Sequence, residues 1–453
     1  MTHNQRKLFQ NRYSTREFLF SRTDSKKHGK KAGSVYPDPD ELKLNELKKE
    51  FPDILFGRSF IDRAVDSLDS LSQFGAMVIQ VDDLDETEND HVTDTLTDTL
   101  IDAARIIDAE CKSKNGIWGQ IDGNMVGCVF PGVSETVCLE LADETRKKLA
   151  ELRKETVSIG IASYPALDYE KASILENAHK ALKHAELIGP GSNVSFDAVS
   201  LNISGDRLYQ EGDINGAIEE FKLALLLDSS NVNVHNSVGV CYGVLGAYEK
   251  AIEHFEEAVR LDAAEVMVLY NAGLINILIN NNDKALEWLI KADSTGDDVF
   301  EVAFHAGKLF FDKGELKKGK LFLEKAVQLR PKSGPAYLYL GECYMAAHMI
   351  DEAVSAYKKA IKNNPNDAAS LSALGYLFDV QGENPDITAI FCQQSIDIEP
   401  ENGLFRNRLG RLYFKQNQLE DALHEFEKAN AFGYDSMEFI EKIQNCLATN
   451  SHR

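Results

Sequence analysis

Long apolar runs are missing from this sequence. No stretch of 18 uncharged apolar residues occurs in the 453 residues, so no segment is predicted to cross a membrane. The first twenty residues, MTHNQRKLFQNRYSTREFLF, carry charges where the core of a secretory signal would be apolar, which argues against a signal peptide. The sequence therefore predicts a cytoplasmic chain.

Paired cysteines and the common catalytic motifs are also lacking. Seven cysteines are scattered along the chain with no C-x-x-C pair, a pattern typical of reduced thiols rather than of disulfides or a zinc site. No P-loop, G-x-G-x-x-G, H-E-x-x-H or G-x-S-x-G motif occurs, and the eleven histidines are dispersed without metal-ligand spacing. The sequence thus predicts no metal site and no cofactor.

Positive charge is scarce outside the N-terminal residues. The formal net charge is −23, yet residues 1–31 carry nine Lys or Arg and two Asp or Glu, or +7, which leaves −30 for the rest. So acidic a body is expected to repel nucleic acid rather than bind it. Residues 1–40 are predicted to be a basic, disordered arm, and the alternatives are contact with an anionic surface, with a nucleic acid or with the protein's own acidic body.

The second half contains a repeat. A glycine recurs at intervals of 34 residues, with a last interval of 35: Gly239, Gly273, Gly307, Gly341, Gly375 and Gly410. In most copies an alanine follows twelve residues later, then a large apolar residue and a second alanine, as in Ala251, Phe255 and Ala258. These spacings place the three side chains on one face of a helix that follows a turn, and prolines such as Pro331 then end it.

This pattern resembles the tetratricopeptide repeat (TPR) family and predicts an all-α superhelix. Seven helix-turn-helix units are expected over residues 198–436, and residues 437–453 resemble a capping helix. The units are placed at 198–231, 232–265, 266–299, 300–333, 334–367, 368–402 and 403–436. The sixth carries an extra residue near GENPD and has Thr388, Cys392 and Ser395 at packing positions, so we expect an irregularity there.

The resemblance implies a concave groove that binds a peptide or a helix of a partner protein. The side chains expected to face it are Asn236, Val240, Tyr270, Leu274, Phe304, Lys308, Leu338, Glu342, Ser372, Tyr376, Asn407 and Arg411. The middle of this set is apolar and aromatic, and the Lys/Asn clamp with which some TPR domains hold a C-terminal carboxylate is not evident. Two alternatives remain open: the aromatic side chains pack between repeats, or the array serves self-association.

Strand and helix patterns alternate in the first half. Strands are predicted at 76–81, 156–165 and 193–196, and helices at about 90–111, 134–152 and 171–187. The stretch GQIDGNMVGCVFPG (119–132) predicts a β-hairpin with a two-residue turn of positive φ at Asp122-Gly123. This order favours an α/β palm with a mostly antiparallel sheet over residues 41–197.

Three stretches of this half resemble the GGDEF family of diguanylate cyclases, which condense two GTP into cyclic di-GMP. They are PDILFGRSFIDRAVDSL, TVSIGIASYP and NAHKALKHAELIGPGSN, and the likeness covers about residues 51–197. In that family two acids hold Mg²⁺ against the triphosphate. Their positions fall here on Gln80 and Met125, an amide and a thioether that bind a hard cation poorly.

Other functional positions of the family have also changed. The Lys and Arg that hold the phosphates correspond to Glu186 and Pro190, and the R-x-x-D of the inhibitory product site falls on SKNG (113–116). The Asn and Asp that recognise guanine do have counterparts, Asn89 and Asp98. A rearranged metal site is a further alternative, made of four acids: Asp82, Asp83, Asp85 and Asp122.

These residues together favour a degenerate domain that has kept the fold of a cyclase and lost its chemistry. The leading interpretation is a cytoplasmic, non-catalytic adaptor of bacterial signalling, in which a pseudo-GGDEF domain is fused to a TPR superhelix that binds a protein. The absence of a spacer around residues 197–204 predicts that the two parts pack together. The alternatives are a metal-independent guanine-nucleotide sensor acting through the repeats and, third, a residual diguanylate cyclase.

Overall fold

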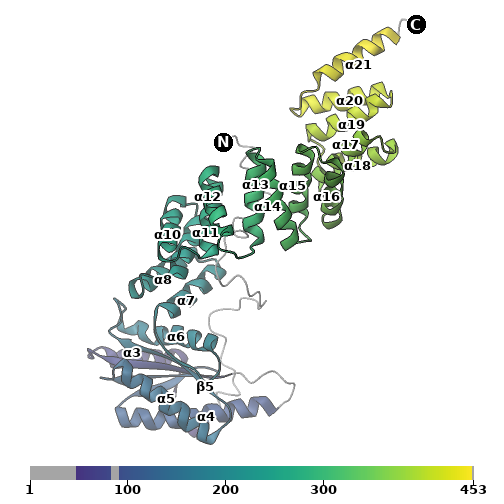
Figure 1. Cartoon of the computed structure of the whole chain (residues 1–453). Helices are drawn as coiled ribbons and strands as arrows, with labels where there is room; N and C mark the ends of the chain where they lie inside the picture. The colour runs from purple at the N-terminus through teal and green to yellow at the C-terminus, as the bar shows by residue number, and fades with distance from the viewer. Residues whose placement is uncertain (1–46, 83–90, 451–453) are drawn as a thin grey trace. The chain divides into compact units, whose positions relative to one another are not determined.

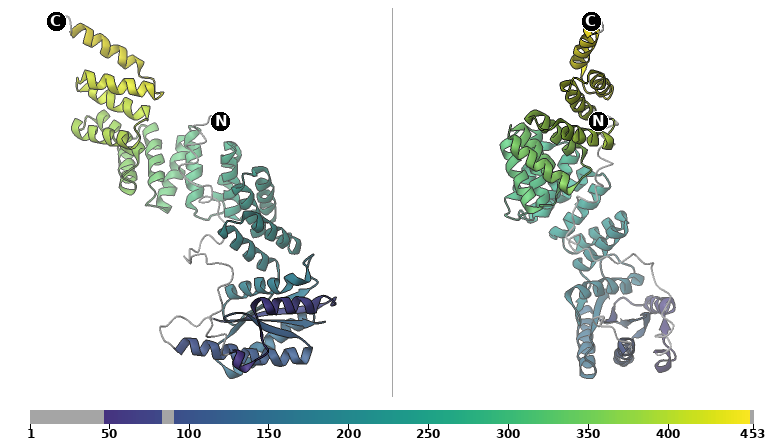
Figure 2. Two further views of the ribbon diagram at one scale, coloured as in Figure 1. Left: turned by 180° about the vertical axis from the view of Figure 1, so that it is seen from behind. Right: turned by 90° about the vertical axis from the view of Figure 1, so that its right-hand side faces the viewer.

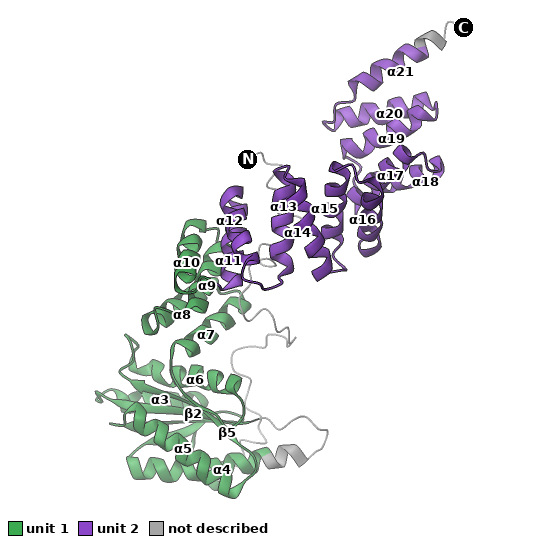
Figure 3. Cartoon of the chain, viewed as in Figure 1, with its two compact units in different colours: residues 1–263 green, residues 264–453 purple. Residues whose placement is uncertain are grey.

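The computed structural model describes residues 47–82 and 91–450 (Figure 1). The chain divides into two compact units, residues 1–263 (unit 1) and 264–453 (unit 2) (Figure 3). The predicted basic arm, residues 1–40, lies outside the described residues, as do Asp83, Asp85 and Asn89. No helix within the described ranges is both long and apolar enough to cross a membrane.

A mixed sheet forms the centre of the α/β part of unit 1. Its strands are β1 (Leu55–Phe56), β2 (Phe74–Val81), β3 (Ile117–Asp122), β4 (Met125–Pro131), β5 (Val157–Tyr164) and β6 (Asn193–Ser195), in the spatial order β1-β3-β4-β2-β5-β6. β2 pairs antiparallel with β4 and β5, and β3 with β4, whereas β1 and β6 pair in parallel at the two edges. The helices of this part are α3 (Gly57–Leu68), α4 (His91–Lys114), α5 (Glu135–Leu152) and α6 (Ile174–Ile188).

Helices cover both faces of this sheet (Figure 1). Because successive side chains of a strand point to opposite faces, β2 sends Met77 and Ile79 to the core under α4 and α5, and Ala76 and Val78 to the core under α3 and α6. Nearly every residue of β2 is buried, as expected for a central strand that is covered on both sides. The C-terminal end of β2 is therefore fixed in position by two hydrophobic cores.

The β3–β4 hairpin differs from the prediction at its turn. β3 runs through Asp122 and β4 begins at Met125, so the two turn residues are Gly123 and Asn124. None of these residues has a positive φ. The cause is a register shift between Gln120 and Asp122, because a bulge adds one residue to β3 and moves the turn along the chain.

The remaining helices follow one another in pairs (Figure 2). Unit 1 contains α7 (Ala198–Glu211) with α8 (Ile214–Leu227) and α9 (Val232–Val244) with α10 (Tyr248–Leu261). Unit 2 contains α11 (Val266–Leu278) with α12 (Asn282–Asp293), α13 (Phe300–Asp312) with α14 (Leu316–Leu329), α15 (Gly334–Ala346) with α16 (Ile350–Asn363), α17 (Ala368–Gln381) with α18 (Pro385–Ile398), α19 (Gly403–Lys415) with α20 (Leu419–Ala431), and finally α21 (Met437–Asn450). The two helices of each pair pack on each other, and α21 packs on α20.

The repeated glycines lie where the helices of a pair approach each other closely. A Cβ on Gly341 of α15 would come within 2.7 Å of the Tyr357 ring of α16. Gly205 of α7 meets Phe221 of α8 in the same way, at 2.5 Å, and extends the series of glycines into the first pair. The large residue fills the space that the glycine leaves, so the 34-residue spacing expresses a packing constraint.

The sixth pair, α17 and α18, takes up the extra residue of its repeat at the turn. α17 has 14 residues where α15 has 13, and it is followed by Gly382, whose φ of +72° is readily adopted by glycine. Thr388, Cys392 and Ser395 are buried at the packing positions, and a Cβ on Gly375 would lie 2.7 Å from the Cys392 sulfur. The pair therefore closes on the small side chain of Cys392, where α15 and α16 close on the ring of Tyr357.

Helix α6 joins the sheet to the helix pairs of unit 1. Two residues separate β6 from α7, and the second of them, Asp197, caps α7 by accepting a hydrogen bond from the Ser200 N–H at 2.8 Å. On the outer side of α6 the Lys180 Nζ lies 2.7 Å from Glu220 Oε1 of α8, and these side chains are only 9% and 15% exposed. The sheet and the first helix pair thus pack together within unit 1, and the packing of the whole repeat array with the α/β part stays a prediction.

Replacement of Gly341 by Val is expected to lower the free energy of unfolding by about 2 kcal/mol, because the added side chain collides with the Tyr357 ring. Urea denaturation followed by circular dichroism measures this change. The matched control is Ala346→Val at an exposed position of the same helix, where only helix propensity changes, by roughly 0.5 kcal/mol. Equal losses in the two variants would show that the glycine is not a packing requirement.

Replacement of Lys180 by Met is expected to destabilise unit 1 by about 3 kcal/mol, because Glu220 is left as a nearly buried charge without its cation. In the double variant Lys180→Met/Glu220→Met most of this loss should be recovered, since two apolar side chains replace the ion pair. Denaturant midpoints of the full chain and its variants measure both effects. A double variant no more stable than the single one would contradict this account of the contact.

Candidate functional site

The structure brings Gln80 and Met125 together at the end of the central strands. They are direct partners in the antiparallel register of β2 and β4, and Met125 packs against the core under α3 and α6. Beside them the Val81 N–H donates to the Asn124 carbonyl at 3.2 Å, which closes the end of β2 against the hairpin turn. An amide and a partly buried thioether therefore occupy the two neighbouring positions, and this donor set does not fit Mg²⁺.

The acids near this point are engaged by the protein itself. Asp82 accepts hydrogen bonds from Thr156 Oγ1 at 2.5 Å, from Ser158 Oγ at 2.5 Å and from the Gly191 N–H at 2.7 Å. Asp122 accepts from the N–H of the adjacent Gly123 at 2.5 Å. Within the described ranges, no three His, Cys, Asp or Glu side chains are grouped so that they could hold a metal ion.

Glu186 lies in the last turn of α6, at the position where the resemblance places a phosphate-binding lysine. Its carboxylate accepts a hydrogen bond from Lys183 Nζ at 2.7 Å, one turn earlier on the same helix. Pro190 follows between Gly189 and Gly191, which both have positive φ. A carboxylate at this point disfavours a triphosphate.

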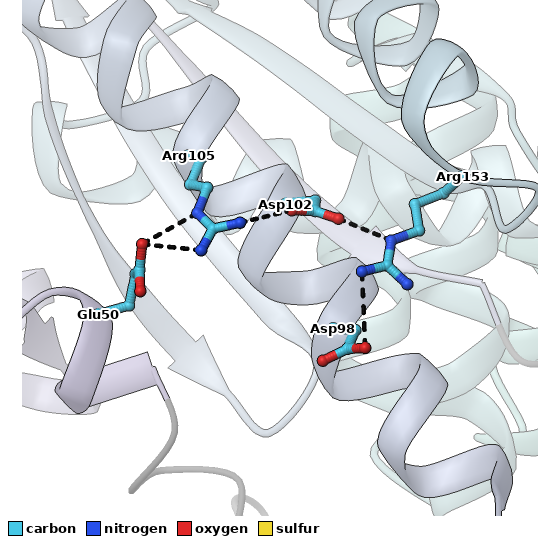
Figure 4. Close-up of polar contacts among 5 residues, drawn as sticks. All are labelled: Glu50, Asp98, Asp102, Arg105 and Arg153. Atoms are coloured by element: carbon cyan, nitrogen blue, oxygen red, sulfur yellow. Dashed lines mark hydrogen bonds and ion pairs between the residues drawn. The ribbon is translucent and has the colours of Figure 1, made fainter.

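Asp98, the described member of the guanine-recognising pair, belongs to a chain of ion pairs (Figure 4). Arg153 donates to Asp102 Oδ2 at 2.6 Å, and its other nitrogen lies 3.6 Å from Asp98. Arg105 in turn bridges Asp102 and Glu50, at 2.9 Å from each. Asp98 lies on α4, across the sheet from the core that Met125 joins, so the structure does not bring it together with that position.

A cavity of about 360 Å³ lies between the C-terminal end of α5 and the start of β5. Four cations line it, Arg146, Lys147, Arg153 and Lys154, together with the acids Asp143 and Glu155 and the loop at Gly191. The sequence analysis missed this site. The basic residues were visible as a cluster in TRKKLAELRKE, but their convergence with a loop about 40 residues further along the chain depends on the parallel pairing of β5 and β6.

Half of the side chains predicted to line the repeat groove are buried, which contradicts a place in an open groove for five of them, whereas Asn236 lines a cavity formed by α6, α7 and α9. The buried side chains are Asn236, Val240, Tyr270, Leu274, Ser372 and Asn407. The reason is local packing and hydrogen bonding: Asn407 Nδ2 donates to Ser436 Oγ at 2.8 Å. The Tyr270 ring, which has no exposed surface, packs at 5.9 Å from the His305 ring.

The other predicted groove residues are partly exposed, and several belong to aromatic and cationic clusters of unit 2. They are Phe304, Lys308, Leu338, Glu342, Tyr376 and Arg411. Phe304 stacks on Phe300 at 5.6 Å and meets the edge of Tyr339 at 5.8 Å. Lys308 Nζ lies 5.1 Å from the Tyr339 ring centroid, and Glu342 accepts a hydrogen bond from the Tyr357 hydroxyl at 2.9 Å. Aromatic side chains thus pack between repeats and still offer surface beside them.

A second cluster surrounds Tyr376 near the end of unit 2. The guanidinium carbons of Arg408 and Arg411 lie 5.3 Å and 5.7 Å from the Tyr376 ring centroid, and Arg411 also lies 5.8 Å from the Phe439 ring of α21. The sequence analysis missed Arg408 and Phe439. Neither residue falls on the two repeat positions from which the groove residues were predicted, so the 34-residue periodicity does not identify either as a surface residue of the groove.

Three segments match known repeat families. Residues 232–265 and 310–375 match families described as tetratricopeptide repeat, and residues 205–246 match one described as TPR repeat. The helix pairs are therefore tetratricopeptide repeats, as the glycine spacing predicted, and such repeats act as scaffolds for protein–protein interaction. No curated protein matches the chain.

Several solved structures, one of them described as a TPR protein, resemble part of the chain. YrrB, described as a TPR protein with an unusual peptide-binding site, is 19% identical over 41% of this chain and 95% of its own, with a TM-score of 0.38. PilF of Pseudomonas aeruginosa is 19% identical over 46% of this chain and 95% of its own, with a TM-score of 0.41. A MamA protein is 29% identical over 36% of this chain and 96% of its own, with a TM-score of 0.34.

His305, between Tyr270 and Phe304, predicts a pH dependence of stability. Burial, together with the nearby Lys308, lowers the His305 pKa to about 4. Since the unfolded chain binds this proton near pH 6.5 and the folded chain does not, the free energy of unfolding should fall as the pH drops from about 6.5 to about 4. In His305→Phe this part of the fall, about 3 kcal/mol in total, should disappear.

Urea denaturation of the full chain at a series of pH values between 7 and 4 measures the effect. The control is His424→Phe, because His424 is exposed and the same replacement there removes no buried imidazole. If the pH profiles of His305→Phe and the parent chain run parallel, His305 does not titrate differently in the folded state.

Proposed function

We propose that this chain is a non-catalytic signalling adaptor. Its TPR surface binds a protein or peptide partner, and its α/β part is a GGDEF-like domain without cyclase activity. The observation that carries the second half of this proposal is the pairing of Gln80 with Met125, where a cyclase would present two metal-binding acids. Bacterial origin, which rests on the sequence resemblance alone, and a cytoplasmic location, which rests on the scattered cysteines and the charged N-terminal residues, are part of the same proposal.

The strand order supports the GGDEF-like assignment. The β3–β4 hairpin lies beside β2, and β5 and β6 follow on the other side of β2, which is the arrangement expected of a palm with its hairpin next to the central strand. The Asp82 hydrogen bonds and the Asn124–Val81 contact support the proposed absence of cyclase activity. They hold the strand ends closed with groups that a metal site would need free.

A second function, metal-independent binding of a guanine nucleotide, is favoured by one observation. The cavity lined by Arg146, Lys147, Arg153 and Lys154 is large enough for much of a nucleotide and carries the positive charge that phosphates need. It also adjoins Asp98, which lies 3.6 Å from Arg153. The Arg153 contact competes with guanine for the Asp98 carboxylate, which is why the adaptor function ranks first.

Incubation of the full chain with GTP and Mg²⁺ is expected to yield no cyclic di-GMP, because an amide, a thioether and a carboxylate replace the groups that hold metal and phosphate. Chromatography of the nucleotides, with an active diguanylate cyclase as positive control, measures this. Formation of cyclic di-GMP would refute the non-catalytic assignment.

Calorimetric titration of the full chain with GTP, GDP and cyclic di-GMP, with and without Mg²⁺, separates the two candidate functions. The adaptor proposal expects no binding up to millimolar nucleotide. Metal-independent binding that is lost in Lys154→Ala and in Asp98→Ala, but kept in Lys112→Ala, would favour the sensor. Lys112 is a suitable control because it is an exposed residue of α4 that pairs with Asp108 at 2.6 Å, outside the cavity.

A further inference from the structure

Two arginines of α19 have no acidic partner among residues 47–82 and 91–450. Arg408 donates to Ser372 Oγ at 3.0 Å, and Arg411 contacts the rings of Tyr376 and Phe439. Among the described residues, no carboxylate lies within 4.0 Å of either guanidinium group. Both side chains are partly exposed.

The other two arginines described in unit 2, and one lysine of α19, are paired with acids. Arg330 lies 2.6 Å from Glu301, Arg406 lies 2.7 Å from Glu425, and Lys415 lies 2.7 Å from Asp379. Lys415 and Arg411 lie on the same helix, four residues apart. In a chain with a net charge of −23, two unpaired guanidinium groups side by side are a local exception in charge.

The aromatic rings hold the guanidinium groups in place. Tyr376 and Phe439 contact them at 5.3–5.8 Å, a separation at which a cation is attracted to the ring face. Such contacts leave the N–H groups at the edge of the guanidinium plane available, and these edges match the two oxygens of a carboxylate. The rings also offer apolar area next to the charge.

We propose that the surface formed by Tyr376, Arg408, Arg411 and Phe439 binds an acidic, extended segment of the partner protein. This inference rests on the proposed adaptor function and specifies the chemistry of its partner. Arg408 and Arg411 are three residues apart on a helix, so their Cβ atoms are roughly 5–6 Å apart. Side chains two residues apart in an extended peptide lie on the same side at roughly 7 Å, so a segment with acids at alternate positions fits both arginines.

The acidic charge of the whole chain does not prevent this interaction. At physiological ionic strength charges are screened beyond about 8 Å, so the peptide senses mainly the groups that it touches. Repulsion between the acidic peptide and the rest of the acidic chain lowers instead the rate at which the peptide associates. Lower salt should therefore strengthen the contact with the arginines without turning the surface into a general binder of anions.

Phage-displayed random twelve-residue peptides, selected on the immobilised full chain, test the inference. The selected peptides should carry net negative charge with Asp or Glu at alternate positions. Their dissociation constants, measured by fluorescence anisotropy, should rise about tenfold or more in Arg408→Gln/Arg411→Gln. The rise should be larger in Arg411→Glu than in Arg411→Gln. Lys415→Gln, which removes a charge already paired with Asp379, should change them less than threefold.

The possible failures are distinguishable. If no peptide is enriched, the proposed adaptor function itself loses its support. If neutral or basic peptides are enriched, or if acidic peptides bind the double arginine variant as tightly as the parent chain, the adaptor function stands and this inference is overturned. Arg411→Gln alone tests the same point should the double variant fail to fold, because Arg411 makes no side-chain hydrogen bond within the described residues.

Discussion

Helix α6 is packed on two sides, and the architecture of unit 1 depends on this. On its inner side β5 approaches so closely that a Cβ on Gly160 would lie 2.0 Å from the Ala178 carbonyl oxygen. On its outer side it carries Lys180, which meets Glu220 of α8. An isolated α/β domain would leave that side to water. Here the helix is a layer between a sheet and a pair of helices. Its outer side is polar at Lys180, as it would be in a helix exposed to water, so the sequence of α6 alone does not reveal that this side is covered.

On the proposal that the α/β part is a degenerate cyclase domain, its hydrophobic cores explain how the fold persists without the chemistry. Its hydrophobic cores depend on the alternating apolar residues of β2, such as Met77 and Val78, and these require no acid at the strand end. On the same proposal, Gln80 in place of an acid leaves both cores intact, because Gln80 belongs to neither of them. Met125 even adds to the packing, because its side chain joins the core under α3 and α6. In this interpretation, selection for packing and selection for catalysis act on neighbouring but separate residues.

The helix pairs could be predicted from the sequence because each depends on local spacing. Gly341 and Tyr357 must meet, and their separation of sixteen residues fixes a turn between two helices. The hairpin turn could be predicted only to within one residue, since the bulge after Gln120 has no strong sequence signal. The positions of Asn89 and of residues 1–40 remain predictions, because they lie outside the described residues.

Side-chain exposure in the repeats was harder to predict than helix position. Tyr270 and Phe304 occupy the same position of successive repeats, yet the first is fully buried and the second is partly exposed. The difference in exposure comes from the side chains of adjacent repeats, and the sequence of a single repeat does not include these side chains. For the same reason the cluster around Tyr376 and the cavity beside Arg153 could be recognised only in three dimensions, since each is assembled from elements far apart in the chain.

The short connection between β6 and α7 has a mechanical consequence. With two residues between them and Asp197 fixed as the cap of α7, the joint has little freedom to act as a hinge. A rotation of the first helix pair against the sheet would have to break the Lys180–Glu220 ion pair as well. A force that acts on the first helix pair is therefore passed to the sheet through α6, because the sheet, α6 and the first helix pair move as one rigid unit.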